Sequence, residues 1–267
     1  MDFMIRWSLI LVFATAVALA QDAPALSKEQ MAASAKNQVI SMPMPGELFA
    51  ALGKVTKPDW SAFVRKPIPT NFTNRHQIAM NLGGLIADGY LAIEATDGQQ
   101  VKNIARDVRT LANALGVGQD LLNRGNSISE FATNNQWDAL KEELEAAQNE
   151  VIAAMLAHDD QGLVTFVSLG GWARGTEVIT AQIAKHYSAG AARILRQPGI
   201  ARIFVNNLGA MPAKVTDNPV IKRVRLTLFE IHKAVEFPGE HTPTADDVRK
   251  LNALAATMVK DIATKDL

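Results

Sequence analysis

The sequence predicts an all-α protein, a single bundle of roughly eight to ten helices. Apolar residues recur every three or four positions along nearly the whole chain, which is the spacing of one buried helix face. No stretch shows the alternation of apolar and polar residues that is typical of a half-buried strand. Five prolines interrupt residues 42–71, so we expect this part to wrap the bundle as an irregular arm.

Residues 1–20 resemble a secretory signal peptide. A weakly basic start with Arg6 is followed by an apolar run from Trp7 to Val17, and the small residues at 18 and 20 precede Gln21. The run is shorter than the about 20 apolar residues of a permanent membrane span. We therefore expect a cleaved protein in the periplasm of a Gram-negative cell, and an uncleaved N-terminal membrane anchor is the alternative.

We expect three segments in the chain. Residues 1–20 form the signal peptide, residues 21–71 an N-terminal helix and the proline-rich wrapping arm, and residues 72–267 the helical bundle, which makes one domain with the arm. Neither disulfides, c-type haem attachment nor a lipoprotein lipid is available, because the sequence has no cysteine. The 27 basic and 27 acidic residues balance, which gives no electrostatic argument for nucleic acid as a partner.

The longer helices after residue 96 are marked by caps and by a continuous apolar face. The third or fourth residue spacing is clearest in residues 101–115, 137–155, 221–235 and 248–262. The expected boundary residues are, in chain order, Asp97 with Gln100, Gly116, Asn218 before Pro219, and Thr244 with Asp247. Shorter helices are expected at residues 47–52, 59–64, 121–124, 188–195 and 198–208. Another short helix is expected to begin at the capping box formed by Ser127 and Glu130.

Two further segments, residues 81–98 and 168–179, have helical patterns but contain a repeated Leu-Gly-Gly. A glycine inside a helix costs about 1 kcal/mol relative to alanine. One explanation is an internal duplication around the two Leu-Gly-Gly helices. The other is that each segment solves the same packing problem separately.

Glycine on a helix face lets a second backbone approach more closely than any side chain would permit. We therefore expect the two segments to meet, with Asp88 near Arg174 and with Glu177 completing an ionic cluster. The hypothesis for this contact is a groove for a ligand or partner, lined by Gly83, Gly84, Asp88, Tyr90, Gly170, Gly171, Trp172, Arg174 and Glu177. The alternative is that Arg174 only fixes the helix register, and that the two aromatic side chains are core residues.

A second candidate site is a divalent metal site. His232 and Glu236 are four residues apart on one helix face, and His241 follows after the Pro238-Gly239 turn, so three ligands could reach one ion. A solvated pair of His and Glu explains the same spacing without a metal. No other cofactor is predicted.

Common catalytic signatures are missing from the sequence. Gly116 and Gly118 begin like a dinucleotide fingerprint, but residue 121 is leucine, and no Gly-x-Ser-x-Gly, Ser-x-x-Lys, His-Glu-x-x-His or phosphate loop occurs. The leading hypothesis is therefore an exported, non-catalytic protein that binds an unknown partner protein or small molecule in the glycine groove. The alternatives are a metal-binding protein or metal-dependent enzyme that uses His232, Glu236 and His241, and a carrier of an apolar ligand in the bundle interior.

Overall fold

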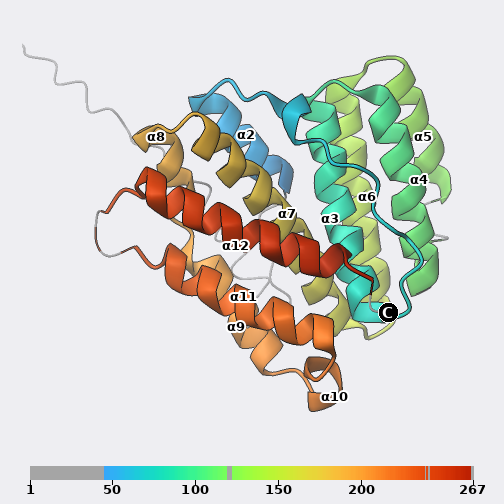
Figure 1. Cartoon of the computed structure of the whole chain (residues 1–267). Coiled ribbons are helices and arrows are strands. Elements are labelled where there is room, and N and C mark those ends of the chain that lie inside the picture. The colour runs from blue at the N-terminus through green and yellow to red at the C-terminus, as the bar shows by residue number, and fades with distance from the viewer. Residues whose placement is uncertain (1–44, 119–121, 238, 240, 266–267) are drawn as a thin grey trace, which may run out of the picture.

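The computed structural model describes residues 45–118, 122–237, 239 and 241–265. These residues form only helices and connecting segments, without a β-strand, which confirms the all-α prediction (Figure 1). The elements are α2 (Pro45–Val55), η1 (Trp60–Phe63), α3 (Arg75–Glu94), α4 (Gly98–Leu115), α5 (Leu122–Thr133), α6 (Trp137–Ala157), α7 (Gln161–Lys185), α8 (Ala189–Ala192), η2 (Arg193–Leu195), α9 (Pro198–Gly209), α10 (Ala213–Thr216), α11 (Pro219–Val235) and α12 (Ala245–Ala263).

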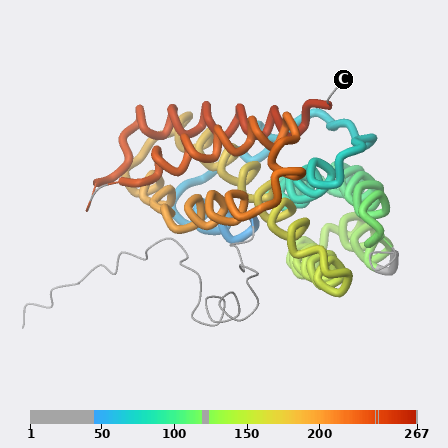
Figure 2. The backbone as a smooth tube through the Cα atoms, turned by 90° about the horizontal axis from the view of Figure 1, so that it is seen from below, coloured from blue at the N-terminus to red at the C-terminus, as the bar shows by residue number. Residues whose placement is uncertain are grey.

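Helices α3 and α7 form the centre of the bundle. Every residue from Gln77 to Ile93 in α3 is buried, so this helix has neighbours on all sides. Helices α4, α5 and α6 lie on one side of the central pair, whereas α9, α11 and α12 lie on the other (Figure 1, Figure 2). The chain thus forms two groups of helices that meet at the contact between α3 and α7.

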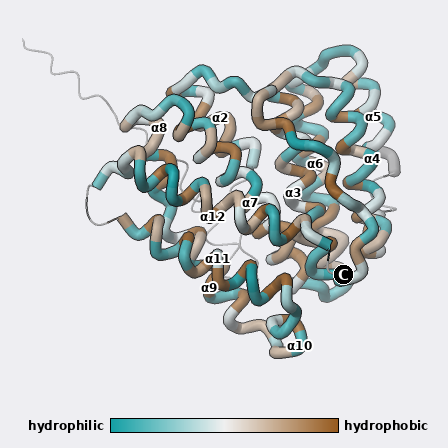
Figure 3. Tube along the Cα trace, viewed as in Figure 1, coloured by the Kyte–Doolittle hydropathy of each residue, from teal (hydrophilic) through white to brown (hydrophobic). Residues whose placement is uncertain are grey.

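The outer helices are amphipathic. Hydrophobic and hydrophilic residues alternate around the turns of α4, α11 and α12 (Figure 3). Their apolar faces point inward, since Leu111 of α4, Ile231 of α11 and Met258 of α12 are fully buried. Burial of these faces is the main stabilising contribution for helices of this kind.

The predicted helix boundaries agree with the caps in the structure. The Asp97 side chain accepts a hydrogen bond from the Gln100 amide, and Gly116 ends α4 with a left-handed φ of 86°. Asn218 caps α11 before Pro219, and Thr244 and Asp247 form a full capping box at α12. Each cap satisfies backbone groups that the first or last helical turn leaves without a partner.

One local prediction was wrong, and one short helix was not predicted. Residues 122–133 form one helix, α5, where two short pieces were expected around a Ser127 capping box. The helix continues through Ser127, since Ile128 and Ala132 on its inward face are buried. A Ser-x-x-Glu pattern marks a helix start only where the serine precedes the first helical turn. The short helix α10 was not expected at all.

The described part of the proline-rich segment packs on the core. Leu48, Phe49 and Leu52 of α2 are buried, and the Phe49 ring lies 5.3 Å from the ring of Trp60. Helix α2 contacts both α3 and α7. The predicted signal peptide and the predicted N-terminal helix lie outside the described residues, and the division into three segments stays a prediction. No helix in the described part of the chain has the length and apolar character needed to cross a membrane.

Candidate functional site

The backbones of α3 and α7 touch at two glycines. A Cβ atom built on Gly83 would lie 1.8 Å from the carbonyl oxygen of Val167, and one built on Gly170 would lie 1.8 Å from the carbonyl oxygen of Met80. Both distances are far below the 3.0 Å that real Cβ contacts respect. These two positions therefore need glycine because of close backbone approach, and not because of a turn.

Neighbouring glycines of the same surface are covered as well. Gly84 faces the Arg65 Nη2 atom, which would be 3.3 Å from an added Cβ, and Gly171 faces Pro45 at 3.4 Å. Arg65 and Pro45 both come from the proline-rich segment. The predicted groove is thus filled by backbone, by an arginine and by a proline.

Asp88, Arg174 and Glu177 lie together beside this contact. Arg174 Nε donates a hydrogen bond to Asp88 Oδ1, and Arg174 Nη1 donates one to Glu177 Oε2. Both donor–acceptor distances are 2.7 Å. Arg174 Nη2 donates to the carbonyl oxygen of Phe63 at 2.7 Å. Only 6% of Asp88 and 5% of Arg174 is exposed, so the pair is buried between the helices.

The second oxygen of Asp88 binds a residue that the sequence analysis did not single out. Arg65 Nε donates to Asp88 Oδ2 at 2.7 Å. Arg65 lies in the irregular segment between η1 and α3, where no periodic pattern or motif marks it. Two arginines and two carboxylates therefore form a charge-balanced cluster.

Asp88 and Arg174 are the buried members of the cluster, whereas the side chains of Glu177 and Arg65 are 21% and 22% exposed. Burial alone would lower the pKa of the Arg174 guanidinium, but the charges of Asp88 and Glu177 outweigh it and hold that pKa above its usual range. Ion pairs between helices, of which the Asp88 and Arg174 pair is buried, hold the elements in register.

A small cleft with a mixed polar and apolar lining adjoins this cluster. Its volume is about 380 Å³ when its open mouth is counted, and its polar lining residues include Arg65, Asp88, Gln100, Asn103 and Asp107. Burial raises the pKa of the Asp107 carboxyl. Both oxygens of Asp88 are already bound by arginines, so this carboxylate is not available to a ligand.

The two aromatic residues of the predicted groove point to different neighbours. Tyr90 is buried against Gly46 of α2, and burial raises the pKa of its hydroxyl. Trp172 packs on the ring of Phe204 from α9 at 5.4 Å. Both are core residues in the structure.

The three predicted metal ligands do not converge. His232 Nε2 lies 3.4 Å from Glu236 Oε1, whereas His241 Nε2 lies 3.3 Å from Asp247 Oδ2 at the start of α12. Within the described part of the chain, no three His, Cys, Asp or Glu side chains are placed to hold one metal ion. His241 supports the capping box of α12 instead.

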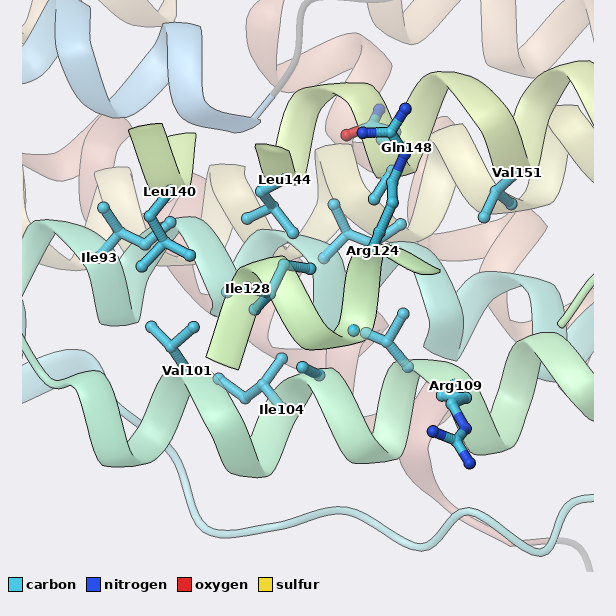
Figure 4. Close-up of a pocket in the computed structure, with 16 residues that line it drawn as sticks. Ile93, Val101, Ile104, Arg109, Arg124, Ile128, Leu140, Leu144, Gln148 and Val151 are labelled. Atoms are coloured by element: carbon cyan, nitrogen blue, oxygen red, sulfur yellow. The ribbon is translucent and has the colours of Figure 1, made fainter. Parts of the chain in front are cut away.

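An apolar opening lies elsewhere, between α3, α4, α5 and α6. It encloses about 650 Å³ when its open mouth is counted, although only a small part is wide enough for a water-sized sphere. Sixteen residues line it, and thirteen of these are apolar or glycine (Figure 4). We call it the α3–α6 cavity.

Small residues of the four helices create the α3–α6 cavity. Gly89 of α3 lies in its wall, and the nearest atom to an added Cβ would be Leu144 Cδ2 at 3.1 Å. Ala105, Gly125 and Ala147 line it from the other three helices. The only sequence feature that could indicate this cavity is the presence of small residues on the inward faces of the helices. Such residues are equally typical of closely packed helices.

Three polar residues complete the lining. Arg124 is fixed by two carboxylates of α6, with Nη1 3.1 Å from Glu143 Oε2 and Nε 2.6 Å from Glu150 Oε2. The hydrogen bond from Arg124 lowers the pKa of Glu150. Gln148 and Arg109 are the other two.

The sequence matches no protein-family model, and comparisons with curated proteins and with solved structures found no match.

Proposed function

We propose that the protein is an exported binding protein that carries a small apolar molecule in the α3–α6 cavity. The observation that carries this proposal is the lining, which is apolar or glycine at thirteen of sixteen positions. Ligand sites are typically concave and mostly apolar, with a few polar groups that fix orientation. This cavity has that composition.

The geometry favours this hypothesis over the glycine groove. The groove positions are occupied by the backbones of α3 and α7 and by Arg65 and Pro45. The lining of the α3–α6 cavity also contains no acid, histidine or hydroxyl among its sixteen residues. That lining supports binding, because general acid–base chemistry needs such groups within reach of a substrate.

The length of the cavity sets a measurable limit on chain length. Val101 and Arg109 of α4 both line it, and eight residues of helix span about 12 Å. Each buried methylene contributes about 0.8 kcal/mol, so two more carbons should tighten binding by about tenfold. We expect the affinity of a series from hexanol to dodecanol to rise and then level off, as measured by isothermal titration calorimetry.

A matched pair of variants tests the location. Ala147 is buried and lines the cavity, whereas Ala153 lies exposed further along α6. Ala147→Leu should abolish decanol binding by filling the space, and Ala153→Leu should bind decanol as the parent does. If no alkanol binds the parent, or if Ala147→Leu binds equally well, the proposal fails.

Export rests on the pattern of residues 1–20. Fractionation of a Gram-negative host that produces the full chain should recover the protein from the periplasm, with a new N-terminus near Gln21. Native mass spectrometry of that fraction would also show a ligand that purifies with the protein. Recovery of an uncleaved chain from the membrane would instead support the anchored alternative.

A further inference from the structure

The two groups of helices beside α3 and α7 carry opposite net charge. Residues 97–160, which contain α4, α5 and α6, have five basic and eleven acidic residues and a net charge of −6. Residues 186–267, which contain α8 to α12, have twelve basic and eight acidic residues and a net charge of +4. Helices α4 to α6 lie on the opposite side of the central pair from α9, α11 and α12 (Figure 2). The protein as a whole is neutral, but its basic side is suited to an anionic surface.

Two large apolar side chains are exposed next to each other on the basic side. Leu226 is 71% exposed and Phe229 is 48% exposed, three residues apart on the outward face of α11. The other large apolar side chains that are exposed in the described part of the chain are Val55 and Tyr187, which belong to other elements. Single exposed apolar residues are ordinary, whereas apolar surface with a charged rim is typical of contact with a partner or a membrane.

Lysines continue the apolar pair in both directions along α11. Lys222, Leu226, Phe229 and Lys233 are spaced by four, three and four residues, so they lie in one line on the helix surface. Lys233 Nζ lies 4.5 Å from the centre of the Phe229 ring. The stem of a lysine can cover apolar surface in this way while its charged end reaches polar surroundings. We call this line of four residues the α11 stripe.

The carboxylates beside the α11 stripe form only exposed ion pairs. Lys222 lies 3.6 Å from Asp217 and Lys233 lies 2.8 Å from Glu230, with all four side chains at least 51% exposed. Such pairs contribute little to stability, so a lipid phosphate can replace either carboxylate as the partner of its lysine. Arg225, next to the stripe, makes no hydrogen bond or ion pair with any residue that the structure describes. The basic excess of this side therefore reaches the outward face of α11.

We propose that the α11 stripe docks the protein on an anionic lipid surface. Leu226 and Phe229 enter the boundary between head groups and acyl chains, which removes their apolar surface from water. Lys222, Arg225 and Lys233 bind the surrounding lipid phosphates. Positive charge alone would also suit a nucleic acid, but phosphate backbone contacts give an exposed leucine and phenylalanine no role. The acidic helices α4 to α6 point away from the lipid in this orientation.

Vesicle sedimentation tests the docking, with vesicles of phosphatidylglycerol and phosphatidylcholine in equal parts and vesicles of phosphatidylcholine alone. The full chain is compared with Leu226→Gln and Lys222→Gln, which change the α11 stripe. Val55→Gln and Lys54→Gln are the matched controls, because they remove an exposed apolar side chain and an exposed lysine from α2. All chains come from one host, so that residues 1–44 are the same in each.

We expect the parent to bind the anionic vesicles more tightly than the neutral ones by about tenfold or more. Leu226→Gln should weaken binding to the anionic vesicles by about tenfold, and Lys222→Gln by about fivefold at low salt. Val55→Gln and Lys54→Gln should bind as the parent does. Equal binding of the two kinds of vesicle, or equal losses in the α11 and α2 variants, would overturn the proposal.

A fluorescent label measures insertion directly, because the chain has no cysteine that would also be labelled. An environment-sensitive dye on Phe229→Cys should emit at shorter wavelength on anionic vesicles, whereas the same dye on Val55→Cys should not change. An unchanged emission at Phe229→Cys would show that the side chain stays in water and would overturn the proposal. Sedimentation equilibrium without lipid tests the other occupant, since a dimer that Leu226→Gln dissociates would make the α11 stripe a protein interface instead.

Discussion

The two sides of α3 use glycine in opposite ways. On the side of α7, Gly83 is filled by a backbone carbonyl group that would lie 1.8 Å from an added Cβ. On the side of α4 and α6, a Cβ atom added to Gly89 would lie 3.1 Å from Leu144 Cδ2, at the end of a side chain. Gly89 also lines the α3–α6 cavity. The comparison shows that a glycine marks a missing side chain, while the fold decides whether backbone or empty space takes its place.

The charged residues of the two sides differ in the same way. Arg174 is buried and every nitrogen of its guanidinium group has a partner, which fixes α3, α7 and the proline-rich segment together. At the α3–α6 cavity, Arg124 is held at the edge and Arg109 has no partner among the described residues. The closed side therefore holds helices in register, and the open side is where we propose that a ligand binds.

The largest effect should come from Gly170→Ala. The new methyl group would collide with the Met80 carbonyl oxygen, and backbone cannot rotate away as a side chain can. We expect a loss of about 3 kcal/mol or more in the free energy of unfolding, measured by urea denaturation followed by circular dichroism. Gly53→Ala is the control, because nothing lies within 4 Å of its Cβ position and the helix should gain up to about 1 kcal/mol. Similar midpoints for the two variants would refute the close contact.

Arg174→Ala should have the next largest effect. It leaves the buried Asp88 and the partly buried Glu177 without their shared partner, and breaking a buried pair typically costs about 3–5 kcal/mol. We expect the lower end of this range because Arg65 still binds Asp88 at 2.7 Å. Arg75→Ala provides the matched exposed case, since its pair with Asp160 is solvent-accessible and should contribute less than about 1 kcal/mol. Equal losses in both variants would show that burial of the Arg174 cluster adds nothing.

Gly89→Ala should change stability by less than about 1 kcal/mol, because the gain in helix propensity offsets a small movement of Leu144. The same variant should weaken decanol binding by narrowing the cavity. Denaturation and calorimetry on one sample measure both effects. A loss of stability close to that of Gly170→Ala would mean that the two sides of α3 are packed equally tightly.

Much of the fold could be predicted from the sequence because local chemistry determines it. Three helices begin where a side chain accepts hydrogen bonds from backbone amides two or three residues further on, at Asp97, Asn218 and Thr244. The apolar faces of α4, α11 and α12 follow the three- or four-residue spacing of a helix. The Asp88 and Arg174 contact could also be anticipated, since two glycine faces have few other uses in a helical bundle. A duplication around the two Leu-Gly-Gly segments stays a prediction.

The rest of the candidate site depends on long-range packing, for which the sequence carries little signal. Arg65 lies in a segment without regular structure, so nothing local predicts its contact with Asp88. His241 is close in sequence to His232 and Glu236. It instead contacts Asp247, a residue of the capping box at the start of α12. The α3–α6 cavity arises from small residues on four helices, and only the assembled bundle shows whether their space is filled.

The smallest effect concerns pH at the closed side. Burial against Phe166, whose ring lies 4.8 Å away, lowers the pKa of His76 from its ordinary 6.5, and the charge of Arg75 lowers it further. A histidine with a lowered pKa binds fewer protons when folded than when unfolded, so the stability that it contributes is complete above pH 6.5 and declines as pH falls below that value. We expect the urea midpoint of the parent to fall modestly from pH 7 to pH 5, and that of His76→Gln to fall less. Measurement above pH 5 avoids the carboxylates Glu150 and Asp247, whose lowered pKa values place their titration in more acid solution. Parallel midpoints over this interval would show that His76 titrates alike in the folded and unfolded chains, and that the contact of α3 with α7 is open to water at this end.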